Sequence, residues 1–206
     1  MAYLCGLDLG QAQDYTALVI AEQQGTPASY DVRDIQRFSL GTTYPQVVQA
    51  VTALLTTPPL WQETYGFWDR PHTGQRRCAL VMDATGVGRA VTDMFVAAGL
   101  HPIAVSIHGG DRVHHEGHEY HVPKRDLVGV VQVLLQTQRL RIARALDHAE
   151  TLTQELTNFK VTIDPATAHD SYSFWREKDH DDLVLALALA CWYGEYPQRA
   201  GAWGRS

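Results

Sequence analysis

Residues 180–193 read "HDDLVLALALACWY", and in this stretch two adjacent acids stand before an apolar segment of alanine and leucine. An apolar segment of this kind predicts a helix that is buried in the core of the protein. Asp181 and Asp182 would repel each other at neutral pH, and both would lose hydration where the helix packs. Two acids at this position are therefore costly unless a cation neutralises them.

The segments at the start of the chain predict strands followed by a helix. Three apolar or alternating runs are separated by turns, and they predict an antiparallel meander at residues 3–10, 16–23 and 30–40. Residues 44–55 place valine and leucine at helical spacing, so they predict the first helix.

The middle and the end of the chain continue the alternation of strands and helices. The predicted elements are strands at residues 78–83 and 101–107 and helices at residues 89–99, 122–138 and 146–159. The strand, helix and strand within residues 78–107 form one parallel crossover unit, and residues 139–143 form a short strand or a turn. The sequence therefore predicts an α/β fold with a mixed central sheet, antiparallel at first and then parallel, flanked by helices.

Length and composition predict one soluble domain. A chain of 206 residues with 45% hydrophobic content can bury one substantial core, so we expect a single domain over residues 1–206. The longest apolar run is too short to cross a bilayer, and the N-terminus lacks the features of a signal peptide, so we expect a cytoplasmic protein with no membrane partner. Cys5, Cys78 and Cys191 each lie in an apolar stretch, which predicts buried thiols.

The formal net charge of −6 argues against a general nucleic-acid coat but is compatible with a local basic face. Five basic residues lie close together in the sequence: Lys124, Arg125, Arg139, Arg141 and Arg144. They are either an ordinary solvated surface or a surface that holds a DNA backbone.

Three acids lie at the ends of predicted strands or at the start of a predicted helix. These are the positions at which an α/β domain usually forms its ligand site. Asp8 lies near the end of the first strand, Asp83 ends the strand after the first helix, and Asp182 lies in the first turn of the last helix. Each of them alone could be a turn or cap residue. Together they would need a cation, and their hard oxygen ligands suit Mg²⁺ or Mn²⁺. Two such ions about 3.5–4 Å apart can activate water and stabilise the leaving oxygen of a phosphodiester.

Four segments of this chain resemble the C-terminal nuclease domain of the large terminase subunit of tailed bacteriophages. They are "GLDLGQAQDYTALVI" (residues 6–20), "LVMDATGVGRAVTDMF" (80–95), "VPKRDLVGVVQVLL" (122–135) and "HDDLVLALALA" (180–190). The resemblance extends over nearly the whole chain, and its most specific part is the last segment. It implies an RNase H-like fold, related to Holliday-junction resolvases, and cleavage of viral DNA during packaging.

The resemblance also implies roles for individual acids. Asp8 corresponds to the ligand that bridges two metal ions, Asp83 to the second ligand and Asp182 to the third, and the three are the predicted catalytic residues. Asp14 matches an additional acid of the first motif. Where the resolvase relatives carry a further acid, this chain has Leu185. Further ligation is therefore expected from Asp14, Asp181, His180 or water.

The sequence contains no phosphate-binding loop of the Gly-x-x-x-x-Gly-Lys-Ser/Thr type. We therefore expect no ATPase activity and no translocation from this chain, which is either an excised domain or a free-standing nuclease. The expected function is metal-dependent cleavage of double-stranded DNA with little base specificity, by a phage or prophage protein in the host cytoplasm. Its expected partners are a packaging ATPase or motor, a portal or a small terminase subunit. The alternatives are a resolvase-like nuclease acting on branched DNA and a non-catalytic docking domain of a packaging motor.

Residues 108–121 are rich in glycine, histidine and charge, which predicts an exposed loop or hairpin. Five of these residues are histidines: His108, His114, His115, His118 and His121. Their spacing fits no tight zinc template and no cysteine accompanies them, so a solvent-facing segment near DNA is favoured over a zinc site.

Overall fold

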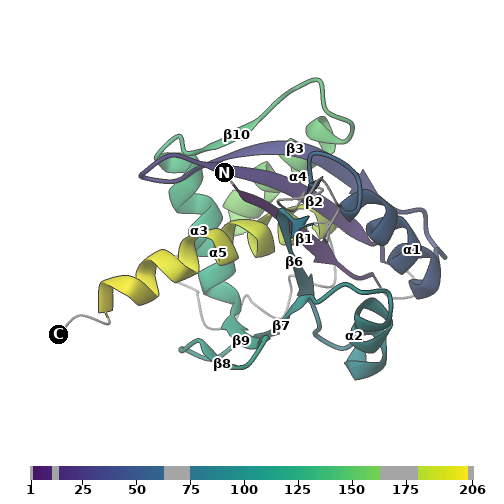
Figure 1. The fold of residues 1–206 in the computed structure, drawn as a ribbon. Coiled ribbons are helices and arrows are strands. Elements are labelled where there is room, and N and C mark those ends of the chain that lie inside the picture. Colours follow the sequence, from purple (N-terminus) through teal and green to yellow (C-terminus); the bar gives the residue numbers. More distant parts are fainter. Residues whose placement is uncertain (1, 11–13, 63–74, 163–180, 204–206) are drawn as a thin grey trace, which may run out of the picture.

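The computed structural model describes residues 2–10, 14–62, 75–162 and 181–203 (Figure 1). Its main feature is a sheet of eight strands in the order β10-β3-β2-β1-β6-β7-β9-β8. The strands are β1 (Ala2–Asp8), β2 (Ala17–Gln24), β3 (Ser29–Arg37), β6 (Cys78–Asp83), β7 (Ile103–His108), β8 (His114–Glu116), β9 (Glu119–Pro123) and β10 (Leu140–Ile142). Two short strands, β4 (Trp61–Gln62) and β5 (Gln75–Arg76), form a separate ribbon.

The directions of the strands confirm the mixed sheet that the sequence predicts. β1, β2 and β3 form the antiparallel meander. β6 then pairs in parallel with β1, β7 with β6 and β9 with β7, while β10 joins the other side of the sheet in parallel with β3. The carboxyl ends of β1, β6, β7 and β9 therefore lie on the same side of the sheet, at the ends of the strands and not at an outermost strand. We call this end of the sheet the acid edge because Asp8 and Asp83 are there, and we call the other end of the strands the opposite edge.

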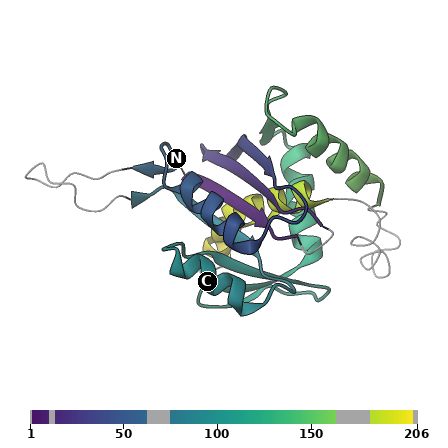
Figure 2. The same cartoon turned by 90° about the vertical axis from the view of Figure 1, so that its right-hand side faces the viewer.

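Five helices cover the two faces of the sheet in the described part of the chain (Figures 1 and 2). They are α1 (Tyr44–Leu55), α2 (Gly88–Ala97), α3 (Lys124–Gln136), α4 (Ala149–Thr162) and α5 (Asp182–Trp203). α1 and α2 pack on the face that carries Cys5 and Leu7, whereas α3, α4 and α5 pack on the face that carries Leu4 and Val19. Successive residues of β1 thus point to opposite cores, as the two-residue period of a strand requires.

α5 lies directly against β1, and this contact depends on a glycine. A Cβ atom at Gly6 would lie only 1.8 Å from the carbonyl oxygen of Ala186, one turn after the start of α5. The residues from Leu183 to Trp192 are all buried, so the helix is enclosed on every side, as its apolar sequence predicts. Gly6 therefore lets the start of α5 approach the strand that ends in Asp8.

Two further expectations concern the cysteines and the membrane. Cys5, Cys78 and Cys191 are buried free thiols, as predicted. In the described ranges, no helix combines the length and the apolar character that crossing a bilayer requires.

Candidate active site

Asp8 and Asp83 leave neighbouring parallel strands at the same level. The register pairs Leu7 of β1 with Met82 of β6, so the next residue of each strand is one of these two acids. Parallel strands lie about 4.8 Å apart, which brings the two predicted ligands close together at the acid edge. The strand pairing thus confirms that the two chain segments meet, although their role as metal ligands stays a prediction.

The turn after β6 fixes the carboxylate of Asp83. Asp83 is 4% exposed, and its Oδ1 accepts a hydrogen bond from the backbone N–H of Thr85 at 2.7 Å. Thr85 is itself held in place, because its Oγ1 accepts a hydrogen bond from the N–H of Ile107 on β7 at 2.7 Å. Asp83 is therefore positioned by a turn that is tied to the neighbouring strand.

Asp14 lies on the segment that follows β1. The N–H of Gly10 donates to Oγ1 of Thr16 at 3.1 Å, and a Cβ at Gly10 would lie 2.3 Å from the carbonyl oxygen of Asp14. The chain thus folds back on itself just after Asp8. Asp14 is exposed and lies near the acid edge, where its carboxylate is a further candidate ligand.

Asp182 is the first residue of α5 and is 5% exposed. Arg37, the last residue of β3, holds it: Nε and Nη2 of Arg37 both lie 2.7 Å from Oδ2 of Asp182. Asp8 pairs with Ala17 on β2, and Ala17 pairs with Arg37. Arg37 therefore belongs to the same row across the sheet as Asp8, and its ion pair brings Asp182 to the acid edge.

Asp181 precedes α5 as a cap residue, because its carbonyl oxygen accepts the N–H of Leu185 at 2.9 Å. The helix begins at Asp182, which the sequence predicts in its first turn. His180 lies outside the described residues.

Glu155 of α4 is an acid of this site that sequence reasoning missed. Its Oε2 accepts hydrogen bonds from the N–H groups of Leu183 and Val184, at 3.1 and 3.2 Å, and so caps the start of α5. Its Oε1 is buried, has no hydrogen-bond partner and lies 3.6 Å from Nη2 of Arg37. The available signal was its position three residues after Leu152, on the apolar side of an amphipathic helix.

Burial dominates the electrostatics of Glu155. Desolvation, followed by the negative charge of Asp182, raises the pKa of Glu155 from 4.5 to about 7. The N–H of Val184 and the charge of Arg37 act in the opposite direction but do not offset these effects. The raised pKa means that the ionised form of Glu155 is disfavoured in the fold. An additional cation nearby would favour the ionised form and lower this pKa.

The acids of this edge fit a divalent metal by their chemistry. They offer carboxylate oxygens, and Asp182 already holds one cation, the guanidinium of Arg37. Within residues 2–10, 14–62, 75–162 and 181–203, no three His, Cys, Asp or Glu side chains converge as metal ligands do. Binding of a metal would therefore require these side chains to turn toward one another.

The five basic residues predicted to contact DNA do not share one face. Lys124 and Arg125 begin α3 directly after β9, so they lie at the acid edge. Arg125 is exposed, and its Nη1 lies 2.6 Å from Oδ1 of Asp111. Leu140 pairs with Tyr30 near the start of β3, at the opposite edge, which places Arg139 and Arg141 there. The two groups are separated because α3, at 13 residues, runs about 20 Å from one edge to the other.

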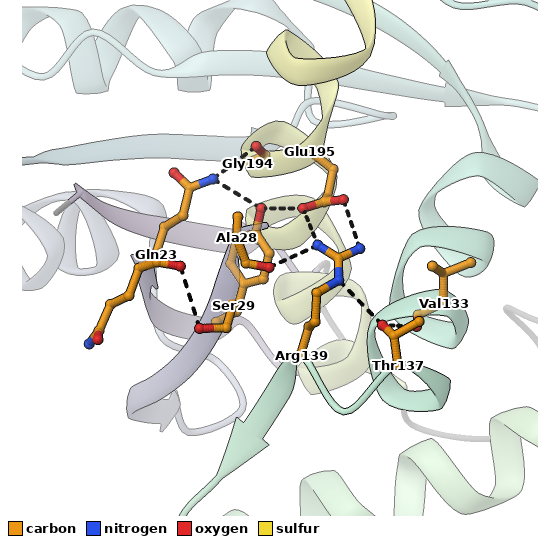
Figure 3. A network of polar contacts seen from close by, with 10 residues as sticks. Gln23, Ala28, Ser29, Val133, Thr137, Arg139, Gly194 and Glu195 are labelled. Carbon is orange, nitrogen blue, oxygen red and sulfur yellow. Dashed lines mark hydrogen bonds and ion pairs between the residues drawn. The ribbon is translucent and has the colours of Figure 1, made fainter. Parts of the chain in front are cut away.

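Arg139 takes part in an internal network at that opposite edge (Figure 3). Its Nη1 and Nη2 lie 2.9 and 3.1 Å from the two carboxylate oxygens of Glu195, and Nη1 also donates to the carbonyl of Ala28 at 2.8 Å. Its side chain is only 19% exposed. Arg141 is more exposed and pairs with Asp31, and Arg144 is exposed in the segment after β10.

The histidine-rich segment forms a hairpin of β8 and β9 rather than an irregular loop. The rings of His114 and His121 stack with centroids 4.5 Å apart, and His108 lies 5.8 Å from His114.

Several solved structures with a similar fold are nuclease domains of viral terminases. The large terminase nuclease from thermophilic phage G20c aligns with a TM-score of 0.55 at 19% identity, over 92% of this chain and 80% of its own. The P22 large terminase nuclease domain aligns with a TM-score of 0.50 at 14% identity, over 97% and 81%. A human cytomegalovirus terminase nuclease domain, Mn-soaked and inhibitor-bound, aligns with a TM-score of 0.50 at 11% identity, over 96% of this chain and 85% of its own.

No family model and no curated protein matches the sequence. Identities below 20% show the fold and nothing finer. The resemblance stated from the four sequence motifs is thus confirmed at the level of architecture: this chain has the RNase H-like fold of the terminase nuclease domains.

Proposed function

We propose that this chain is a metal-dependent endonuclease that cleaves double-stranded DNA with little base specificity during viral genome packaging. The observation that carries the proposal is the arrangement of Asp8, Asp83 and Asp182 at one edge of the sheet. Two strand ends and a helix start come to this edge, where α/β proteins usually bind ligands, and each carries one of the acids. The fold it shares with terminase nuclease domains supports the same reading.

Asp8, Asp83 and Asp182 would hold Mg²⁺ or Mn²⁺, in a site for two ions, with Asp14 and Asp181 as further candidate ligands. A divalent metal in such a site supplies an activated water and a positive charge beside the leaving oxygen of the phosphodiester. The cytomegalovirus domain of the same fold was soaked with Mn, which agrees with a preference for hard divalent ions.

The chain's own residues position this chemistry. The N–H of Thr85 holds Oδ1 of Asp83, and Arg37 holds Oδ2 of Asp182. Glu155 fixes the first turn of α5 by accepting two of its N–H groups, so the helix presents Asp182 at a defined height above the sheet. These contacts fix the chain segments that carry the acids, from which the carboxylates would turn toward a metal.

Lys124 and Arg125 would contact the DNA backbone beside this edge. They begin α3, and the positive end of a helix favours phosphate. The ion pair between Arg125 and Asp111 is exposed, so releasing Arg125 to a phosphate would cost little. Contacts of this kind hold DNA without reading its bases.

The setting of this activity follows from the same proposal. The chain would act in the host cytoplasm as a phage or prophage product, as one nuclease domain over residues 1–206. Its partners would be double-stranded DNA and a packaging ATPase or motor, a portal or a small terminase subunit. Such a motor would raise the local concentration of DNA at a domain that binds DNA weakly by itself.

Cleavage of supercoiled plasmid by the purified chain tests this proposal. We expect Mn²⁺ or Mg²⁺ to support nicking and linearisation and EDTA to abolish both, with no effect of added ATP. A four-way junction in a parallel reaction should be cut no faster than linear duplex. Selective, symmetrical cutting of the junction would instead favour a resolvase-like nuclease, and no cutting with any metal would favour a docking domain.

A further inference from the structure

Arg37 lies between two buried carboxylates. Its Nη2 is 2.7 Å from Oδ2 of Asp182 and 3.6 Å from Oε1 of Glu155. The side chain of Arg37 is 16% exposed, and those of Asp182 and Glu155 are 7% and 8% exposed. Charges this well buried interact strongly, because little water separates them.

The unpaired oxygen of Glu155 indicates what this cation does. Oε2 of Glu155 accepts the N–H groups of Leu183 and Val184, whereas Oε1 is buried and accepts no hydrogen bond from the described part of the chain. A buried carboxylate oxygen without a donor is costly. The charge of Arg37 compensates in part, and a guanidinium this close to two acids supplies much of what a bound metal would supply.

The position of Arg37 in the sheet places this cation beside the candidate metal ligands. Arg37 ends β3 and pairs with Ala17 of β2, which in turn pairs with Asp8 of β1. The neighbouring strand β6 ends in Asp83 at the same level. The guanidinium also lies over the ring of Tyr15, 4.1 Å from its centroid, so it is held from both sides. Its charge is therefore fixed at the acid edge.

We infer that Arg37 is the resident counter-ion of the metal-free site and competes electrostatically with the divalent metal at Asp182, while Glu155 opposes it. The inference rests on the proposed function, because it takes Asp182 as a metal ligand. Removing the charge of Arg37 makes the site more negative and strengthens metal binding. Removing the charge of Glu155 has the opposite effect. Arg37 and Glu155 are thus positioning residues that set the affinity for the metal.

The test is a calorimetric titration of the full chain with Mn²⁺, using Arg37→Gln, Glu155→Gln, the double variant and Asp83→Asn. A unit charge a few ångströms from a divalent ion changes its affinity about tenfold even at a dielectric constant near that of water. We therefore expect the Mn²⁺ dissociation constant to fall about tenfold in Arg37→Gln and to rise by a similar factor in Glu155→Gln. Glutamine at position 155 still offers an oxygen to the N–H groups of α5.

The double variant keeps the inference testable if Arg37→Gln does not fold, because it removes one positive and one negative buried charge together. It should bind Mn²⁺ more tightly than Glu155→Gln alone. Equal or weaker binding than Glu155→Gln would overturn the inference, as would unchanged or weaker binding in a folded Arg37→Gln. A merely structural role for Arg37 would lower the melting temperature equally with and without Mn²⁺.

The Asp83→Asn variant separates this inference from the proposed function. If wild type binds Mn²⁺ and Asp83→Asn does not, the metal site exists, and the position 37 variants alone decide the inference. If Asp83→Asn binds Mn²⁺ as wild type does, the proposed metal site is wrong, and the role of Arg37 in it is wrong as well.

Discussion

Arg139 and Glu195 form a two-point ion pair, with Nη1 and Nη2 of the guanidinium 2.9 and 3.1 Å from the two carboxylate oxygens. This pair joins the residue before β10 to α5 (Figure 3). The hydroxyl of Tyr30 adds a hydrogen bond that it donates to Glu195 at 2.8 Å. Burial and the neighbouring Glu195 raise the pKa of Tyr30, so its hydroxyl stays a donor. The network holds α5 far from Asp182, at the edge opposite the candidate site.

Replacing Arg139 should therefore lower stability. We expect Arg139→Ala to reduce the free energy of unfolding by about 2 kcal/mol, because it leaves the mostly buried Glu195 carboxylate without its ion pair. Urea unfolding measures the effect. Arg141→Ala is the matched control: Arg141 is 59% exposed and pairs with Asp31, so its loss should cost less than about 0.5 kcal/mol. Equal losses in the two variants would argue against the network as a stabilising element.

Replacing Asp83 should abolish cleavage without unfolding the protein. In Asp83→Asn, an amide oxygen can still accept the N–H of Thr85, so the turn after β6 persists. The melting temperature in EDTA should be unchanged or higher, because one negative charge is removed from the acid edge. Ca²⁺ should bind the wild type but support cutting poorly, since its coordination is looser. Plasmid cleavage measures the activity.

Asp93→Asn provides the matched control for this exchange. Asp93 is an exposed acid of α2, so its replacement should leave cleavage at the wild-type rate. Full activity in Asp83→Asn would remove Asp83 from the site.

The two groups of basic residues should differ in their effect on DNA binding. The double variant Lys124→Ala, Arg125→Ala should weaken binding about equally for all duplex sequences. It should also reduce the slope of log binding constant against log salt concentration by about one to two units. Arg141→Ala with Arg144→Ala changes the same number of charges, in and just after β10, and should leave the slope nearly unchanged. Fluorescence anisotropy at several salt concentrations distinguishes the pairs. A larger slope change for the second pair would place DNA on the other edge.

The pH dependence of stability should contain a contribution from Glu155. Its pKa is about 7 in the folded protein and has its ordinary value of 4.5 when the chain is unfolded, so the fold binds this proton more tightly. The stabilisation is fully present below about pH 4.5 and is lost as the pH rises through about 7.

Between pH 5 and 8, we expect the metal-free protein in EDTA to lose about 2 kcal/mol relative to Glu155→Gln, which does not titrate. Urea unfolding of both proteins at a series of pH values gives this difference. A constant difference over that range would show that Glu155 keeps its ordinary pKa in the fold.

The sequence predicted the parts of the fold that depend on local pattern. The meander, the parallel unit from β6 to β7 and the buried α5 each have a clear hydrophobic period, and Asp8 and Asp83 are visible as acids that end apolar strands. β10 was ambiguous, because three residues are too short for a period to decide between a strand and a turn.

The sequence could not predict contacts between distant segments. Arg37 and Asp182 are 145 positions apart, and nothing local in either segment indicates that they meet. Glu155 has the appearance of a surface acid until α5 packs on it. Arg139 was grouped with Lys124 by charge, and only the tertiary structure reveals that Glu195 already uses that charge.

The most direct measurement is anomalous diffraction at the manganese edge from crystals grown with Mn²⁺, because the central claim is that Asp8, Asp83 and Asp182 hold divalent metal at one edge of the sheet. We predict anomalous density within about 2.2 Å of carboxylate oxygens from all three acids. In Asp83→Asn crystals this density should be weaker or absent. Manganese bound elsewhere, for example at the histidines of β8 and β9, with none at the acid edge, would contradict the account.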